Sequence, residues 1–525
     1  MRRHGRPHRI AAALLTACLS LLTACSVSVS FGTTTKSTST TSSSLAVGSS
    51  LPDAGSGTTP VPSALVWHSC GTFLCSTLVV PVSYSDAGDG TLRLAVIELP
   101  STSGAKSAPD VVLNPGGPGA SGVQFLQSTV SEYPASLRAK FNLVSFDPRG
   151  VGESDPVQCT TPAGLRRWIA LDPDPVTPKA IAAVIGAVKV FDAGCAADVP
   201  RDLLANLSTA VSAQDMDRLR AALGETKLHY LGFSYGTYLG ALYAEMFPTH
   251  VGNMVLDGAV DPALSSASLD IEQADSFEVD LHDFFSWCPT NATCAGELPH
   301  GAAATYRTVM GRLKAGGSLT ADLTAALGGV QRVNYAVALL GVISSLYTTT
   351  TWPYLAEGLA EATTGNGLVL SALALSYAGF NANGTANNLI SSNIAIDCLD
   401  RPVPPVPNYP SLARRFAKAA PDFGAVEAWG SLPCDYWPVP PTGKAVPIRL
   451  SEPLPILVVG STHDPATPYA WAKALTRQLT GSELLTRTGD GHTGYFSSSC
   501  VQGWVDSYLA TGARPPVGTV CASNN

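Results

Sequence analysis

Residues 228–238 read Leu-His-Tyr-Leu-Gly-Phe-Ser-Tyr-Gly-Thr-Tyr, which joins an apolar run to a Gly-x-Ser-x-Gly pattern and the start of a predicted helix. This order predicts a tight strand-to-helix turn that presents the hydroxyl of Ser234 at its tip. Gly232 and Gly236 suit such a turn because a larger side chain would collide with neighbouring backbone. An ordinary turn with an exposed serine has the same pattern, so a reactive serine requires a base and an acid elsewhere in the chain.

The length and charge of the chain limit the classes of protein to which it can belong. Its 525 residues are enough to bury large cores, and about two domains are expected. Charged residues make up 14% of the chain and the formal net charge is -8, with no basic cluster outside the N-terminus. This charge excludes the basic surface that a nucleic-acid partner would require.

The N-terminus has the pattern of an export signal. Four arginines within residues 2–9 precede an apolar run at 10–22, which is too short for a comfortable membrane span. Leu22-Thr23-Ala24-Cys25 resembles the signal of bacterial lipoproteins, so we expect residues 1–24 to be a signal peptide and Cys25 to carry lipid. Cys18 ends a similar pattern after a shorter apolar run, and an ordinary secretory signal is the other alternative.

Residues 25–62 are rich in Ser, Thr and Gly. Such a segment buries too little apolar surface to offset the entropy lost on ordering, so it predicts a flexible tether. We therefore expect a protein that is secreted across the cytoplasmic membrane and lipid-anchored to the cell membrane.

Ten cysteines follow Cys25, and an even number in an exported chain predicts disulfides. A metal site is the competing interpretation, but the cysteines are scattered and no His-rich spacing accompanies them, so neither a metal nor a cofactor is expected. Nearest-neighbour pairing joins Cys70–Cys75, Cys159–Cys195, Cys288–Cys294, Cys398–Cys434 and Cys500–Cys521.

Strand and helix patterns alternate on both sides of a long helical block. The alternation predicts an α/β fold with one mostly parallel sheet, divided into residues 63–262 and 448–525, and a helical cap inserted at 263–447. Strands are predicted at 78–82, 92–99, 110–113, 142–146, 228–231, 253–257, 454–460 and 483–487, and helices at 213–223, 239–247, 269–287, 303–313, 333–347, 353–362, 409–420, 470–479 and 495–509.

An acid and a base follow Ser234 in the required order. Asp464 comes after the strand that follows the cap, and His492 comes after the last predicted strand. Enzymes with a serine on such a turn carry nucleophile, acid and histidine in this chain order. We predict that His492 takes the proton of Ser234 and that Asp464 orients the imidazole.

Other residues compete for these places. Asp257 also ends a strand and is an alternative acid. His463 adjoins Asp464 and is expected to be a surface histidine or a support to the site, while Asp490 is expected to be solvated.

A glycine-rich loop at 114–122 follows the strand at 110–113. It lacks the Lys-Ser/Thr of a phosphate loop and the spacing of a dinucleotide loop. We expect the backbone N–H groups of Gly117 and Tyr235 to form an oxyanion hole.

Several motifs together carry a family resemblance. They are Gly116-Gly117-Pro118-Gly119, Asp147-Pro148-Arg149-Gly150, Gly232-Phe233-Ser234-Tyr235-Gly236, Asp464 with Thr467-Pro468, and Gly491-His492. With the cysteine pattern over residues 65–521, they resemble the exported tripeptidyl aminopeptidases and prolyl iminopeptidases of the α/β-hydrolase fold. The resemblance implies a serine exopeptidase that takes peptide substrates with a free N-terminus.

Such an enzyme must bind a substrate ammonium, which requires a carboxylate in a partly dry pocket. Asp400 in the cap is the first candidate, followed by Asp397 and Glu272. Two other functions stay open. A carboxylesterase or lipase would use the same three residues, and a hydrolase scaffold can also serve as a non-catalytic surface binding protein.

Overall fold

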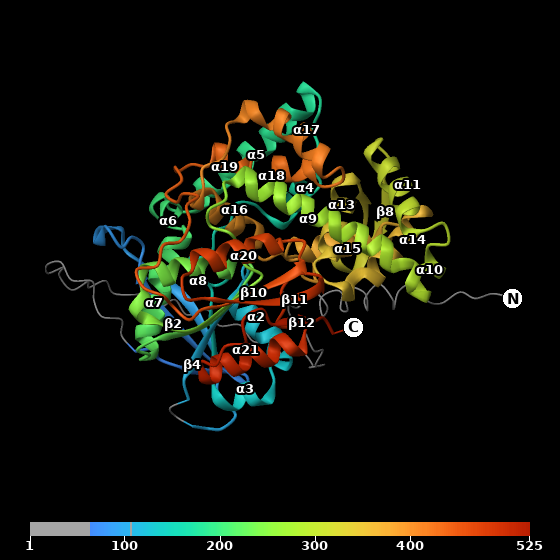
Figure 1. The fold of residues 1–525 in the computed structure, drawn as a ribbon. Coiled ribbons are helices and arrows are strands. Elements are labelled where there is room, and N and C mark those ends of the chain that lie inside the picture. The colour runs from blue at the N-terminus through green and yellow to red at the C-terminus, as the bar shows by residue number, and fades with distance from the viewer. Residues whose placement is uncertain (1–63, 106–107, 525) are drawn as a thin grey trace, which may run out of the picture.

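The computed structural model describes residues 64–105 and 108–524 (Figure 1). The predicted signal peptide at 1–24, the lipidation site Cys25 and the tether at 25–62 lie outside the described residues.

A ten-stranded sheet forms the base of the molecule, with the order β1-β2-β3-β5-β4-β6-β7-β10-β11-β12. Pairs from β1 to β5 along the sheet edge are antiparallel, and all pairs from β5 to β12 are parallel. Central strands are apolar and buried because helices cover both of their faces. The strands are β1 (His68–Cys70), β2 (Phe73–Pro81), β3 (Thr91–Leu99), β4 (Asp110–Asn114), β5 (Asn142–Phe146), β6 (Leu228–Phe233), β7 (Val251–Asp257), β10 (Leu457–His463), β11 (Glu483–Asp490) and β12 (Val520–Ala522).

Two layers of helices enclose this sheet (Figure 1). One apolar cluster joins α6, α7, α8 and α20 to one face, and a second joins α2, α3 and α21 to the other. The helices are α2 (Gly122–Thr129), α3 (Ala135–Lys140), α6 (Arg201–Ala205), α7 (Thr209–Leu223), α8 (Tyr235–Met246), α20 (Tyr469–Gln478) and α21 (Ser499–Thr511).

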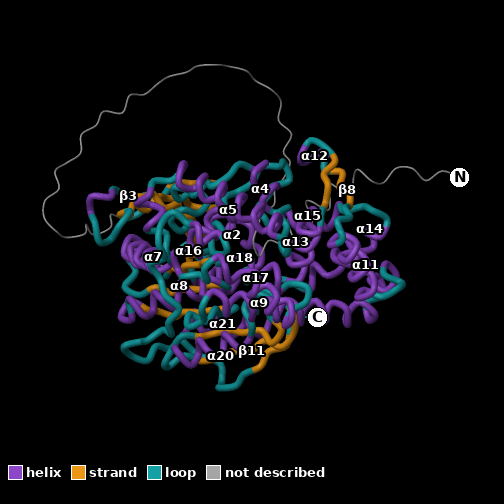
Figure 2. The backbone as a smooth tube through the Cα atoms, turned by 90° about the horizontal axis from the view of Figure 1, so that it is seen from above, coloured by secondary structure: helices purple, strands orange, loops and turns teal. Residues whose placement is uncertain are grey.

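The chain between β7 and β10 is mostly helical and has an apolar core of its own (Figure 2). Within it a short hairpin pairs β8 (Leu319–Asp322) with β9 (Val330–Val333). The helices are α9 (Ser266–Trp287), α10 (Ala292–Glu297), α11 (Ala302–Lys314), α12 (Thr324–Leu327), α13 (Tyr335–Leu346), α14 (Trp352–Thr363), α15 (Leu368–Tyr377), α16 (Leu389–Asp400), α17 (Tyr409–Ala419), α18 (Gly424–Gly430) and α19 (Pro433–Tyr436).

Two further helices, α4 (Pro162–Trp168) and α5 (Pro178–Asp198), lie in sequence between β5 and β6 but pack with the cap. Val184 and Val188 of α5 are buried in a cluster with α17 and α18. Among the described residues, α5 alone is long and apolar enough by length and composition to cross a membrane. Its packing and its disulfide to Cys159 place it in the folded body.

Most predicted elements are present with small shifts of their ends. The strand at 142–146 matches β5 in full, whereas the last helix begins at Ser499 rather than at 495. The turn before it is held because the backbone N–H groups of Gly494 and Tyr495 donate to Asp257. The sequence patterns missed β1, β12 and the hairpin. They also missed the helices α2, α3, α4, α5, α6, α10, α12, α15, α16, α18 and α19. Disulfides join the same five pairs that nearest-neighbour pairing gives.

Candidate active site

Ser234 occupies the turn between β6 and α8 in a strained backbone conformation, with φ 54° and ψ -125°. Non-glycine residues rarely adopt a positive φ, and they keep it where the surrounding structure enforces it. Here the N–H of Ser234 donates to the carbonyl of Asp257 at 2.8 Å. Gly236 has no room for a side chain, since a Cβ atom on it would lie 2.8 Å from Oδ1 of Asn114. The turn is therefore built to present this one serine.

Asp464 and His492 form a close pair at the carboxyl ends of β10 and β11. Nδ1 of His492 lies 2.8 Å from Oδ1 and 3.0 Å from Oδ2 of Asp464. The carboxylate is 1% exposed and accepts further hydrogen bonds from the backbone N–H groups of Ala466 and Thr467. Because a carboxylate accepts, the imidazole carries its proton on Nδ1 and leaves Nε2 able to accept one.

The imidazole of His492 lies beside the serine turn. A Cβ atom on Gly258 would lie 3.1 Å from Cε1 of His492, and Gly258 directly follows the residue that binds the N–H of Ser234. Nε2 of His492 is buried and has no hydrogen-bond partner in the described part of the chain. A buried acceptor without a partner is rare in proteins and marks a position where a substrate or a reacting group is expected.

The cap contributes directly to the position of this histidine, which the sequence patterns did not indicate. The carbonyl of Tyr347, just after α13, accepts the backbone N–H of His492 at 2.7 Å. The Tyr347 ring also meets the imidazole edge to face, with ring centres 5.5 Å apart. No local pattern could reveal this contact, because it joins segments that are far apart in the chain.

Asp257, the alternative acid, has a different set of partners. Its carboxylate accepts the N–H groups of Gly494 and Tyr495 and so holds the loop that follows His492. Burial raises its pKa to about 6, and the two donors counter this rise. The structure thus pairs His492 with Asp464 and assigns Asp257 to the loop.

The glycine-rich loop lies against the serine turn, as its expected chemistry requires. A Cβ atom on Gly116 would lie 2.4 Å from the carbonyl oxygen of Phe233 and 3.0 Å from the backbone nitrogen of Tyr235. The side chain of Asn114 supports the loop by accepting the N–H of Gly116 at 2.9 Å. This proximity places the loop beside the N-terminus of α8 at Tyr235, and Gly117 is the next residue of that loop.

Asp400 is bound to the protein itself. Its two carboxylate oxygens accept the backbone N–H of Thr209 at 2.8 Å and the hydroxyl of Thr209 at 2.5 Å. The Thr209 hydroxyl also contacts the phenol hydroxyl of Tyr235. Burial raises the pKa of Asp400 to about 6, although the bonds from Thr209 lower it. With 2% exposure, this carboxylate links the cap to the serine turn and is not free for a ligand.

The two other carboxylates predicted to bind the substrate ammonium differ from Asp400 in their partners and exposure. Glu272 of α9 accepts the indole N–H of Trp471 at 2.6 Å. Asp397, one turn before Asp400 on α16, keeps an exposed side chain. Although solvent reaches this side chain, desolvation by the protein packed around it and repulsion from Asp400 and Asp270 raise the pKa of Asp397 to about 8.

Comparison with known proteins gives two family matches. Residues 109–326 match the alpha/beta hydrolase fold, and residues 420–521 match the TAP-like protein family.

Three curated relatives cover most of the chain. Serine protease Hip1 of Mycobacterium tuberculosis is 36% identical over 86% of this chain and 88% of its own length. Carboxylesterase B of the same species is 34% identical over 90% of this chain and 93% of its own length. Tripeptidyl aminopeptidase of Streptomyces lividans is 32% identical over 87% of this chain and 85% of its own length.

Proposed function

The chain belongs to the α/β-hydrolase family of TAP-like serine peptidases, and from this premise we propose that it removes short peptides, tripeptides foremost, from free N-termini. The reaction proceeds through an acyl-enzyme on Ser234. Its single strongest support is the arrangement of His492, whose Nδ1 is held by Asp464 while the buried Nε2 is left without a partner among the described residues.

In this mechanism Nε2 of His492 takes the proton of Ser234 as Oγ attacks the scissile carbonyl carbon. Asp464 stabilises the imidazolium that forms, and the same proton then passes to the leaving amine. Water repeats the sequence on the acyl ester and releases the short peptide. Backbone N–H groups of Gly117 and Tyr235 stabilise the oxyanion, and each such donor contributes about a hundredfold or more in rate.

Asp397 is the carboxylate that we assign to the substrate ammonium, in place of Asp400. Protein surrounds its side chain densely, yet the side chain stays accessible to solvent, as expected for a group that lines an enclosed space. Asp270 and Glu427 combine the same two properties, and burial raises the pKa of Glu427 to about 7. An incoming ammonium would relieve the repulsion among these acids, which favours a charged N-terminus at this place.

Export and lipid anchoring through Cys25 are part of the same proposal. Five disulfides in the described chain support an oxidising compartment. Intact-mass measurement of the protein extracted from membranes tests the anchor. A mature chain that begins at another residue, or that begins at Cys25 without lipid, contradicts it.

A substrate panel tests the peptidase specificity. We expect rapid release of anilide from free tripeptide anilides and little release from their N-acetylated forms. Asp397→Asn should raise KM for the free peptides about tenfold or more, since a charge-assisted bond is lost. Asp275→Asn, at an exposed acid on α9, is the matched control and should leave KM unchanged. Equal cleavage of free and acetylated peptides would exclude an aminopeptidase.

The nucleophile is tested separately with a fluorophosphonate. Ser234→Ala should lose both labelling and turnover, while Ser286→Ala, at an exposed serine of α9, should keep both. Labelling that persists in Ser234→Ala contradicts the assignment.

A carboxylesterase is the second candidate, because one relative with 34% identity carries the name Carboxylesterase B. Acyl esters in the same panel decide between the two. Turnover of simple esters far above that of free tripeptides would favour the esterase and leave the role of Ser234 intact.

A further inference from the structure

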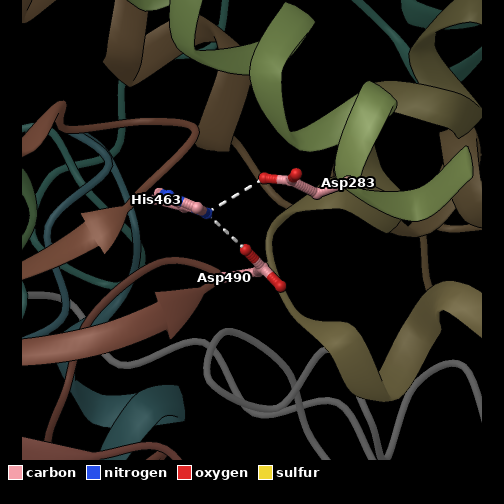
Figure 3. A group of neighbouring side chains, drawn as sticks. All are labelled: Asp283, His463 and Asp490. Carbon is pink, nitrogen blue, oxygen red and sulfur yellow. Dashed lines mark hydrogen bonds and ion pairs between the residues drawn. The ribbon is translucent and has the colours of Figure 1, made fainter. Parts of the chain in front are cut away.

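Three side chains from separate elements meet beside the active site, where the cap contacts the sheet (Figure 3). Asp283 comes from α9, His463 is the last residue of β10, and Asp490 is the last residue of β11. Nδ1 of His463 lies 3.0 Å from Oδ2 of Asp283 and 2.8 Å from Oδ1 of Asp490. The sequence patterns indicated a surface histidine and a solvated acid and did not bring Asp283 to them.

An ion pair alone does not satisfy this geometry. One ring nitrogen has one in-plane position, which holds either a proton or a lone pair, so Nδ1 of His463 cannot donate fully to two carboxylates. A cation that binds all three groups resolves the conflict. Ligand atoms bonded to one tetrahedral zinc ion at about 2.0–2.2 Å lie about 3.3–3.6 Å from one another. The observed separations of 3.0 and 2.8 Å are shorter by only a few tenths of an ångström, so small side-chain movements would admit the ion.

A second observation comes from Asp280, which lies one turn before Asp283 on the same face of α9. It is 1% exposed, and neither of its carboxylate oxygens has a hydrogen-bond partner in the chain as described. Burial, with repulsion from Asp464, Asp490 and Asp283, raises its pKa to about 9. A charged acid that is buried among other acids without a partner is a costly arrangement, so the group either keeps its proton or is compensated by a cation.

The buried cation nearby does not provide that compensation directly. Arg487 donates its hydrogen bonds to the hydroxyls of Ser461 and Ser523 and to the carbonyls of Asp490 and Gly491. All of these acceptors are neutral, so Arg487 forms no direct ion pair with the surrounding carboxylates.

We propose that Asp283, His463 and Asp490 bind a zinc ion, with water completing the coordination. One imidazole and two carboxylates suit Zn²⁺, whereas Ca²⁺ and Mg²⁺ prefer a shell made of oxygen atoms alone. The ion joins cap helix α9 to the ends of β10 and β11. His463 is adjacent to Asp464, and Asp490 is two residues before His492. The metal therefore fixes the cap to the two segments that carry the active-site acid and base.

The test uses the full chain without an affinity tag, stripped with EDTA and titrated with ZnCl₂ by calorimetry. We expect one zinc ion per chain and a higher melting temperature when zinc is bound. His463→Ala and Asp283→Asn should weaken zinc binding about tenfold or more and remove the shift in melting temperature. His300→Ala, at an exposed histidine of the cap, is the matched control and should bind as the wild type does.

Substitution with Co²⁺ gives a second readout that does not depend on catalysis. Visible absorption typical of a nitrogen and oxygen site should appear in the wild type and in His300→Ala, and be lost in His463→Ala. Equal uptake by the wild type and His463→Ala, or no uptake by the wild type, overturns the proposal. Either result would leave His463 as a ring that contacts two carboxylates without a metal. Circular dichroism of each variant checks that it is folded.

Discussion

Gly119 of the glycine-rich loop lies so close to α16 that a Cβ atom on it would come within 2.8 Å of the backbone nitrogen of Asn393. Its φ of 92° is also unfavourable for any residue with a side chain. The same helix bonds to the loop through the side chain of Asn393, which donates to the carbonyl of Pro118 at 3.2 Å. Helix α16 is thus part of the active-site wall, and its contacts set the position of the proposed oxyanion donor Gly117.

Gly119→Ala should therefore move the loop and lower kcat/KM by about a hundredfold, because small displacements of reacting groups have effects of this size. Steady-state kinetics with a free tripeptide anilide measures the loss. Gly503→Ala on α21, where a Cβ atom meets nothing within 4 Å, is the control and should retain full activity. Unchanged kinetics in Gly119→Ala would mean that the loop and the helix are free to separate.

Thr209→Val tests the link between the cap and the serine turn. The substitution keeps the shape of the side chain but removes the hydroxyl that contacts both Asp400 and Tyr235. We expect kcat to fall about tenfold with KM nearly constant, since an interaction that positions the catalytic groups is lost. Asp400→Asn should behave alike. An increase in KM restricted to free peptides would instead assign Asp400 to the substrate ammonium.

The two acids near His492 should respond differently to removal of their charge. Asp464→Asn should lower kcat by about four orders of magnitude, because the amide favours the wrong imidazole tautomer. Asp257→Asn weakens only the bonds to the loop at Gly494 and Tyr495, so we expect mainly a loss of stability of about 1–3 kcal/mol. Kinetics and denaturant unfolding of both variants measure this contrast. The reverse pattern would identify Asp257 as the triad acid.

Asp192 of α5 should make the stability of the protein depend on pH. Both of its carboxylate oxygens are buried without a partner among the residues described, and burial raises its pKa to about 7. Between about pH 4 and pH 7 the folded chain keeps a proton here that the unfolded chain releases, so the free energy of unfolding falls as pH rises across this window.

Asp192→Asn cannot titrate and should remove this decrease. The melting temperature of the variant minus that of the wild type should therefore increase as the pH is raised from 4.5 to 8. Asp198→Asn, at an exposed acid of the same helix, is the control. Parallel pH profiles for Asp192→Asn and the wild type would contradict the expectation.

Much of the fold could be predicted from local sequence patterns. An apolar run followed by Gly-x-Ser-x-Gly leaves the chain few conformations, so the strand, turn and helix around Ser234 follow from nearby residues alone. Asp464 and His492 could be placed at strand ends for the same reason, because the carboxyl ends of parallel strands lie at one edge of a sheet. Cysteines close in sequence were paired correctly because short segments of the cap and core hold them together.

Only the tertiary structure decided which distant groups meet. Asp397 and Asp400 lie one turn apart on α16, and the sequence favoured Asp400, but packing against Thr209 occupies Asp400 and leaves Asp397 accessible. In the same way α5 joins the cap, Tyr347 reaches His492, and Asp283 reaches His463. These contacts join residues tens to hundreds of positions apart, and they depend on how whole layers pack. The sequence thus determined the serine turn and the order of the groups behind it, while the packing of the cap on the sheet decided which carboxylate stays accessible to solvent.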